Sequence, residues 1–147
     1  MVYAALAKET GRFLCIVTPG EAEATRFAGD LNALGIPTAV FPARDYVLRP
    51  IEGTAREYEY RRLSVLGDIV GGRLQAVCVP DEGLTQYTTP RAEFCNNTRT
   101  LHPGDTLPRA ELTALLYGAG YARRDQVDGP GQFSIRGDIV DIYAPDM

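Results

Sequence analysis

The first candidate for chemistry is the segment Thr18-Pro-Gly-Glu-Ala-Glu-Ala-Thr25, which follows an apolar stretch typical of a buried strand. In α/β domains this position can hold a phosphate. The segment contains one glycine, no lysine and two glutamates, and the chain has neither GxxxxGK[ST] nor GxGxxG. Glutamates suit the first turn of a helix, because the helix dipole favours acidic side chains there. We therefore expect no ATP and no other cofactor to bind this chain.

Catalytic and metal-binding groups are sparse. The single histidine, His102, precedes Pro103 and Gly104, so we interpret it as an exposed turn residue rather than a catalyst. Asp138 and Asp141 lie close together, but a metal site needs more oxygen ligands than these two acids supply. The sequence thus predicts no catalytic residue and no metal site.

Arginine is the dominant cation, with fourteen arginines and one lysine. Its forked guanidinium binds carboxylates, phosphates and nucleic acid. Stacking on nucleic acid is one possible role for two neighbouring pairs of side chains, Tyr58 with Tyr60 and Arg61 with Arg62. The packing of an amphipathic helix with a charged outer face explains them as well, and we favour that interpretation. The net charge of −4 argues against a surface that is basic throughout.

Arg136 interrupts the strand-like segment 132–143, whose apolar positions change parity after Arg136-Gly137-Asp138. A strand changes the face of its side chains only at an extra residue or a bend, so we expect a β-bulge at Gly137. An integrin-ligand role would need an extracellular loop and is dismissed. Two interpretations of Arg136 stay open: a protein-binding arginine turned outward by the bulge, or an arginine packed over a neighbouring strand.

Strand and helix patterns alternate along the first half of the chain. Strands are predicted at 13–17, 38–41 and 75–79, and helices at 21–34 and 54–70. Short connections in this order predict an α/β fold with a parallel sheet flanked by helices, Rossmann-like and comparable to an incomplete P-loop-type domain.

The pattern changes in the second half, and we place a domain boundary near Arg91. Residues 1–90 then form the α/β domain without a phosphate loop, and residues 91–147 a small α+β domain. In the latter we expect a short strand at 98–101, a helix after Pro108 and the long strand at 132–143. A helix-like start without a capping signal and a strand-like end suggest that both domains continue in a longer protein, with the second one truncated.

Composition sets broad limits on the class of protein. Apolar residues make up 45% and charged residues 23% of the 147 residues, which excludes a disordered chain. No apolar run approaches the roughly 18 residues of a transmembrane helix, and we expect no membrane contact. Two of the three cysteines, Cys15 and Cys78, lie in apolar segments, as buried free thiols do. The cytoplasm is the compartment that we expect.

Several motifs together resemble a region shared by the excision-nuclease subunit UvrB and the transcription-repair coupling factors of bacteria. The most specific is Gly131-Gln-Phe-Ser-Ile-Arg-Gly-Asp-Ile-Val-Asp-Ile-Tyr143. The others, in the same order and spacing, are 41–46, 62–66, 101–105 and 120–127. The resemblance covers nearly the whole chain.

Two relatives must be separated. UvrB has a phosphate loop near its N-terminus and a long tyrosine-rich hairpin that grips damaged DNA, and neither is visible here. The short connection between Phe41 and Thr54 is similar to that of the coupling factor, which lacks the hairpin, whereas Asp138 is more similar to UvrB. We favour a coupling-factor fragment, with a fragment of UvrB and a stand-alone nucleotide-binding α/β domain as alternatives.

The resemblance implies a non-catalytic module that recruits UvrA during transcription-coupled nucleotide excision repair. It places an ATP-driven DNA translocase motor, with its ATP and Mg²⁺, and the contacts to RNA polymerase and DNA, in other parts of the parent protein. It assigns a UvrA contact to Arg136 and, with weaker motif support, to Arg123. Ser134 stands where UvrB-like sequences can carry another arginine, so we expect that contact to be lost or reduced.

Overall fold

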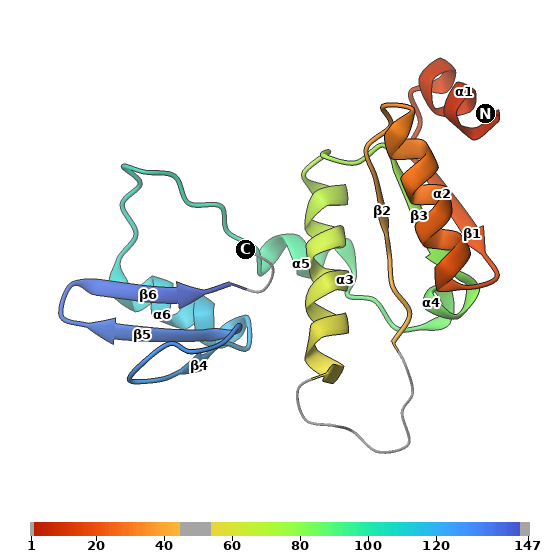
Figure 1. Cartoon of the computed structure of the whole chain (residues 1–147). Coiled ribbons are helices and arrows are strands. Elements are labelled where there is room, and N and C mark those ends of the chain that lie inside the picture. The colour runs from red at the N-terminus through yellow and green to blue at the C-terminus, as the bar shows by residue number, and fades with distance from the viewer. Residues whose placement is uncertain (1, 45–53, 145–147) are drawn as a thin grey trace. The chain divides into compact units, whose positions relative to one another are not determined.

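The computed structural model describes residues 2–44 and 54–144, apart from the side chains of residues 4 and 54–57 (Figure 1). Most of the connection predicted between the second strand and the second helix therefore lies outside the described residues. The chain divides into two compact units, Met1–Thr88 and Thr89–Met147, and each is described by itself.

The first unit is built on three parallel strands. Its elements are α1 (Val2–Thr10), β1 (Leu14–Thr18), α2 (Glu21–Ala33), β2 (Thr38–Val40), α3 (Thr54–Val70), β3 (Ala76–Pro80) and α4 (Asp81–Thr85). Strand β3 lies in the middle, between β1 and β2. This arrangement confirms the predicted α/β fold with a parallel sheet and flanking helices, while the short helix α4 was not predicted.

Helices cover the two faces of this sheet. On one face, α1 and α2 pack against side chains that include Ile16 and Cys78. Figure 1 shows α2 lying along the strands of this sheet. On the other face, Val65 and its neighbours on α3 pack against β2 and β3, with Val77 and Val79 at the centre. Such burial on both faces explains why β3 is apolar at consecutive positions.

Strand β1 is only half buried, which corrects the expectation of a fully buried first strand. Ile16 and Thr18 are buried, whereas Phe13, Cys15 and Val17 are exposed. These three alternate with the buried residues and so belong to the opposite face. The core on that face draws on β2, β3 and α3 and includes no described residue of β1.

The second unit joins two helices to a small mixed sheet, which confirms the predicted α+β character. Its elements are α5 (Arg91–Asn96), α6 (Arg109–Gly118), β4 (Ala122–Arg123), β5 (Gln132–Arg136) and β6 (Ile139–Tyr143). Strand β5 is central, parallel to β4 and antiparallel to β6. The buried Phe133 of β5 meets Tyr117 of α6 edge to face, with 5.3 Å between ring centroids.

The strand predicted at 98–101 does not form. These residues are described, and they have no regular secondary structure. The hydroxyl of Thr98 donates to the carbonyl of Phe94, and its N–H to that of Cys95, so Thr98 ends α5 instead of opening a strand. The short helix α5 itself was not predicted from the sequence.

The prediction of one bulged strand over 132–143 is also wrong, because the segment is a β-hairpin. Strands β5 and β6 pair antiparallel, with Arg136 opposite Ile139, and only Gly137 and Asp138 connect them. Two-residue hairpin turns need a positive φ, and Gly137 has φ 61°. The change of parity in the apolar pattern therefore marks a reversal of the chain.

Within the described residues, none of the helices is both long and apolar enough to span a bilayer.

Candidate partner-binding hairpin and sheet edge

The hairpin β5–β6 sorts its side chains onto two faces. Residues directly opposite each other on antiparallel strands share a face. The pairs Phe133–Ile142 and Ile135–Val140 place four apolar side chains on the face that α6 covers through Tyr117. Arg136 therefore lies on the other face of the sheet.

This second face is partly covered by the loop that precedes β5. The hydroxyl of Ser134 donates to the carbonyl of Asp125 at 3.0 Å, and the side-chain oxygen of Gln132 accepts from the N–H of Asp128. Ser134 is 1% exposed, so its side chain is inside the unit and not on the predicted contact surface. Its hydroxyl already has an internal partner, and the loss or reduction of a partner contact at this position stays a prediction.

The exposed remainder of this face consists of Arg136, Ile139, Asp141 and Tyr143, which we call the Arg136 face. Arg136 and Ile139 are direct neighbours across the hairpin, and Asp141 and Tyr143 follow at every second position of β6. Ile139 is 63% exposed and Tyr143 45%. The guanidinium of Arg136 donates from Nη2 to Oδ2 of Asp141. An apolar and a charged group thus lie side by side on the surface, as at protein-binding sites.

Arg123, the other arginine expected to contact a partner, is exposed but does not share this face. In the parallel register of β4 and β5 it lies beside Phe133. Arg136 comes three residues after Phe133, and strand side chains alternate between faces. The two arginines therefore belong to opposite faces of the sheet, and the structure does not bring them together.

Arg109 supports the turn of the hairpin. It is the first residue of α6, and its Nη1 donates to the carbonyl of Gly137 at 3.2 Å. This bond ties the start of α6 to the hairpin turn beside Arg136. The orientation of the Arg136 face is thus fixed by three features: the turn, the α6 contact and the packing of Phe133.

The carboxyl edge of the parallel sheet is a second candidate site, because open α/β sheets bind ligands there. Arg62 of α3 is 9% exposed at this edge. Its Nη1 donates to the carbonyl of Pro42 at 2.7 Å and more weakly to that of Gly83, and its Nη2 donates to the hydroxyl of Thr88 at 2.9 Å. Its guanidinium also lies 4.0 Å from the ring centre of Phe41. The cation is therefore occupied by protein groups.

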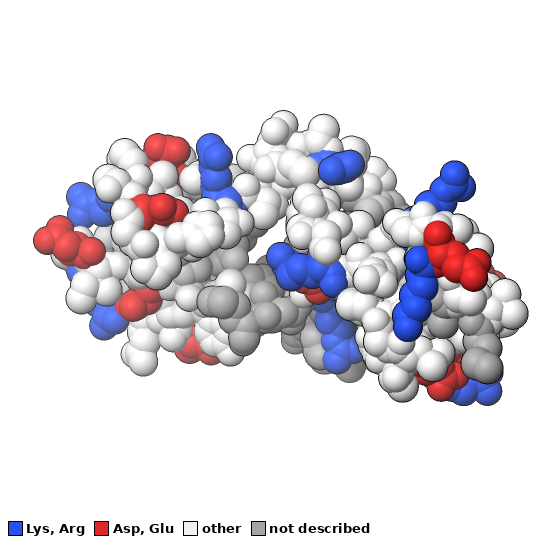
Figure 2. Space-filling view, turned by 90° about the horizontal axis from the view of Figure 1, so that it is seen from above, with Lys and Arg blue, Asp and Glu red and all other residues white. Residues whose placement is uncertain are grey.

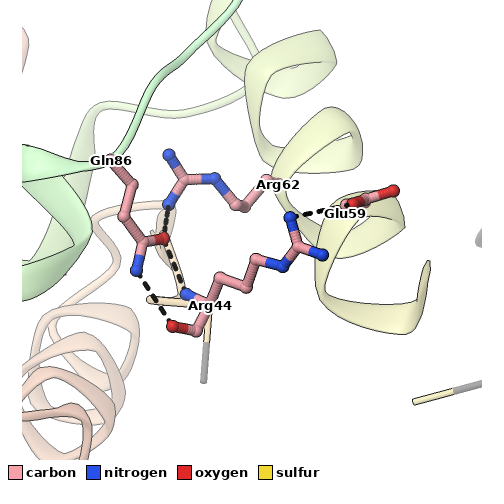
Figure 3. A network of polar contacts seen from close by, with 4 residues as sticks. All are labelled: Arg44, Glu59, Arg62 and Gln86. Carbon is pink, nitrogen blue, oxygen red and sulfur yellow. Dashed lines mark hydrogen bonds and ion pairs between the residues drawn. The ribbon is translucent and has the colours of Figure 1, made fainter. Parts of the chain in front are cut away.

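Gln86 links Arg62 to Arg44 (Figure 3). The side-chain oxygen of Gln86 accepts from the N–H of Arg44 at 2.7 Å and from Nη1 of Arg62 at 3.3 Å. Its amide nitrogen donates back to the carbonyl of Arg44 at 3.0 Å, so the amide pairs with the backbone as a neighbouring strand does. The Arg44 side chain points instead to Glu59, at 3.5 Å. This network holds together segments that are far apart in the sequence.

A hollow of about 150 Å³ at this edge does not have the chemistry of a phosphate site. Glu21 and Glu82 line it with Arg44, whose guanidinium pairs with Glu59. The hydroxyl of Thr18, at the end of β1, donates to the carbonyl of Gly20. Two carboxylates and a neutralised arginine disfavour an anionic ligand. Among the described residues, no group of three or more His, Cys, Asp or Glu residues is placed to hold a metal ion.

The two thiols of the parallel sheet differ in exposure. Burial raises the pKa of Cys78 to about 11, and the charge of Cys15 adds to this shift. Burial also raises the pKa of Cys15, although that residue is exposed on the edge strand β1. Neither thiol has the lowered pKa of a reactive cysteine.

Surface charge is mixed. On the face that Figure 2 shows, the cationic side chains are interspersed with anionic ones, and most of the surface is uncharged. The second unit, residues 89–147, contains six arginines and eight acidic residues in the sequence. An extended basic stripe of the kind that binds duplex DNA is not seen on this face.

Comparison with known proteins agrees with the motifs. Residues 100–147 match the family model of the UvrB interaction domain. Over 95% of its length the chain is 28% identical to the transcription-repair-coupling factor of Bacillus subtilis (strain 168), of which it covers 12%. Over 70% of its length it is 27% identical to the factor of Staphylococcus aureus (strain USA300), of which it covers 9%. The predicted resemblance to the coupling factors is confirmed, and the chain spans about a tenth of the length of these relatives.

Two features of these sites were not predicted from the sequence. Asp141 was considered only as a metal ligand, whereas the hairpin places it beside Arg136. Arg62 was assigned to a charged outer helix face, whereas it is buried at the sheet edge. A Gly-Asp pair between two apolar strand patterns was the available signal for the hairpin. Arg62 had no comparable local signal.

Proposed function

We propose that this chain, whose sequence is similar to part of the transcription-repair coupling factors, is a non-catalytic module that recruits UvrA during transcription-coupled nucleotide excision repair. The observation that carries this proposal is the Arg136 face in the part that matches the UvrB interaction domain. In this proposal, the ATP-driven DNA translocase and the contacts to RNA polymerase and DNA belong to other parts of the parent protein, which is cytoplasmic.

Arg136 is the centre of the proposed UvrA contact. Its side chain is 67% exposed on a hairpin that the Arg109–Gly137 bond and the Phe133 core hold in place. A rigid element that presents an arginine beside an exposed isoleucine has the composition of an interface hot spot. The chemistry of the face predicts a partner surface that offers a carboxylate to Arg136 and an apolar contact to Ile139.

Arg123 has a smaller role in this proposal. Because it lies on the opposite face of the sheet from Arg136, one flat partner surface does not cover both side chains. We expect Arg123 to contribute only where the partner wraps around the β4 edge. The coupling-factor assignment is preferred to UvrB because the relatives from Bacillus subtilis and Staphylococcus aureus both carry the coupling-factor name.

The experiment is a pull-down of purified UvrA by the immobilised chain. Wild type is compared with Arg136→Ala and with Arg99→Ala, a matched loss of an exposed arginine in the same unit. We expect Arg136→Ala to lose most of the captured UvrA and Arg99→Ala to retain it. Thermal melts of the three proteins control for folding, and we expect them to agree closely. Equal capture by all three would remove Arg136 from the proposed site.

A further inference from the structure

The ion pair between Arg136 and Asp141 affects how a partner reaches the Arg136 face. We propose that Asp141 is an intramolecular competitor, which holds the Arg136 guanidinium in the free chain and must be displaced or shared when an acidic partner binds. This inference rests on the proposed function, because it concerns the same arginine. It identifies Asp141 as a residue that sets the affinity for the partner, and it specifies an acidic group on the partner.

The geometry of the hairpin makes the pair local and accessible. Asp141 is directly opposite Ser134, while Arg136 is two residues further along β5, so the pair is a diagonal neighbour across the two strands. The side chains of Arg136 and Asp141 are 67% and 40% exposed. Both are therefore open to a partner, and their pairing can be exchanged for an intermolecular one.

Two electrostatic effects of Asp141 oppose an acidic partner. Oδ2 of Asp141 takes a donor of the guanidinium, whose forked geometry otherwise binds a carboxylate through two parallel bonds. The Asp141 charge also repels any carboxylate that approaches Arg136. An unfavourable charge of this kind selects for partners that compensate it elsewhere, and the exposed Ile139 and Tyr143 offer such a compensating apolar contact.

The expected effect is modest, because exposed ion pairs are weak. Removing the competitor should tighten binding about two- to five-fold, which corresponds to the strength of such pairs. Since salt screens exposed charges, the gain should shrink as ionic strength rises.

The experiment titrates UvrA into the chain at low and at high salt and compares Asp141→Asn with Asp138→Asn. Asp138→Asn is a matched control because this substitution removes the same charge from the same hairpin. It lies in the exposed turn and forms no ion pair with any residue that the structure describes. We expect Asp141→Asn to bind about two- to five-fold more tightly at low salt, and Asp138→Asn to bind like wild type.

Other outcomes separate this inference from the proposed function. Weaker binding by Asp141→Asn would show that Asp141 contacts UvrA itself, and an equal gain in both variants would show a general charge effect; either result overturns the competitor role. If Arg136→Ala binds UvrA like wild type, the proposed contact itself fails.

An NMR measurement on the free chain tests directly whether Asp141 restrains the Arg136 guanidinium. Nitrogen-15 relaxation at Nε of Arg136 reports how mobile the guanidinium is. We expect greater mobility in Asp141→Asn than in wild type, and no change in Asp138→Asn. Unchanged mobility in Asp141→Asn would overturn the inference, regardless of the measured affinities for UvrA.

Discussion

Replacing Arg62 by alanine should destabilise the first unit more than any surface arginine substitution. The side chain is buried, and two of its hydrogen bonds are short, at 2.7 Å to the Pro42 carbonyl and 2.9 Å to the Thr88 hydroxyl. Alanine removes both bonds, the weaker ones to Gly83 and Gln86, and the contact with the Phe41 ring.

The magnitude follows from these contacts. Hydrogen bonds from a charged donor contribute about 1.5–3 kcal/mol each, so the two short ones account for about 3–6 kcal/mol. The guanidinium–Phe41 contact adds about 1 kcal/mol. Water that enters the vacated space recovers part of this loss, and we expect a net cost of about 3–5 kcal/mol. This is a large share of the total stability of about 5–15 kcal/mol of a typical domain.

The assay is thermal and urea unfolding followed by circular dichroism. A domain of this size loses about 4–8 °C of melting temperature per kcal/mol, so Arg62→Ala should lower it by about 12 °C or more. Arg62→Lys should restore little, because one ammonium group does not reach acceptors on separate segments. Arg73→Ala is the matched control: Arg73 pairs with Asp68 on the surface and should cost less than about 1 kcal/mol. If Arg62→Ala and Arg73→Ala melt together, the Arg62 network does not stabilise the unit.

Two further predictions concern the hairpin turn and the thiols. Gly137→Ala should destabilise the hairpin by about 1 kcal/mol, because alanine is strained at φ 61°. Gly118→Ala should not destabilise the chain, because that glycine has open space around it and no positive φ. Urea midpoints compare the two variants, and equal effects would show that Gly137 is not required for its positive φ. Iodoacetamide at pH 8 should label Cys15 and Cys95 and spare Cys78 until urea unfolds the chain, because Cys78 is buried and its raised pKa of about 11 keeps it protonated. Rapid labelling of Cys78 in the native protein would refute its burial. The same rise in the pKa of Cys78 predicts a contribution to the free energy of unfolding that is present below the ordinary pKa of 9.0 and lost as pH rises toward 11, so the urea midpoint should fall over that range.

The secondary structure of the first unit was largely predictable because the sequence patterns that indicate its strands and helices are local. Apolar stretches such as the one around Cys78, followed by proline or glycine, predict strands that are buried on both faces, and the structure forms β3 there. The exposure of Cys15 was not predictable in the same way. Burial of β1 depends on which helices cover each face, and a short apolar run carries no information about its neighbours.

The hairpin shows how one pattern can fit two structures. The parity change after Arg136 is compatible with a bulge or with a reversal, and both place glycine at the irregular position. The difference decides which side chains meet. A bulged strand separates Arg136 from Asp141, whereas the hairpin makes them an ion pair. The Arg62 network was beyond prediction because its acceptors lie 20 to 26 residues away in the sequence.

The most direct test of the account is the affinity of UvrA for the chain, measured by isothermal titration calorimetry with wild type, Arg136→Ala and Arg99→Ala. If Arg136 pairs with a partner carboxylate at the interface, its loss should cost about 2–4 kcal/mol, which is roughly a 30-fold or greater weakening. Arg99→Ala should bind like wild type, and all three melting temperatures should agree. A dissociation constant for Arg136→Ala equal to that of wild type would contradict the proposed role of the hairpin.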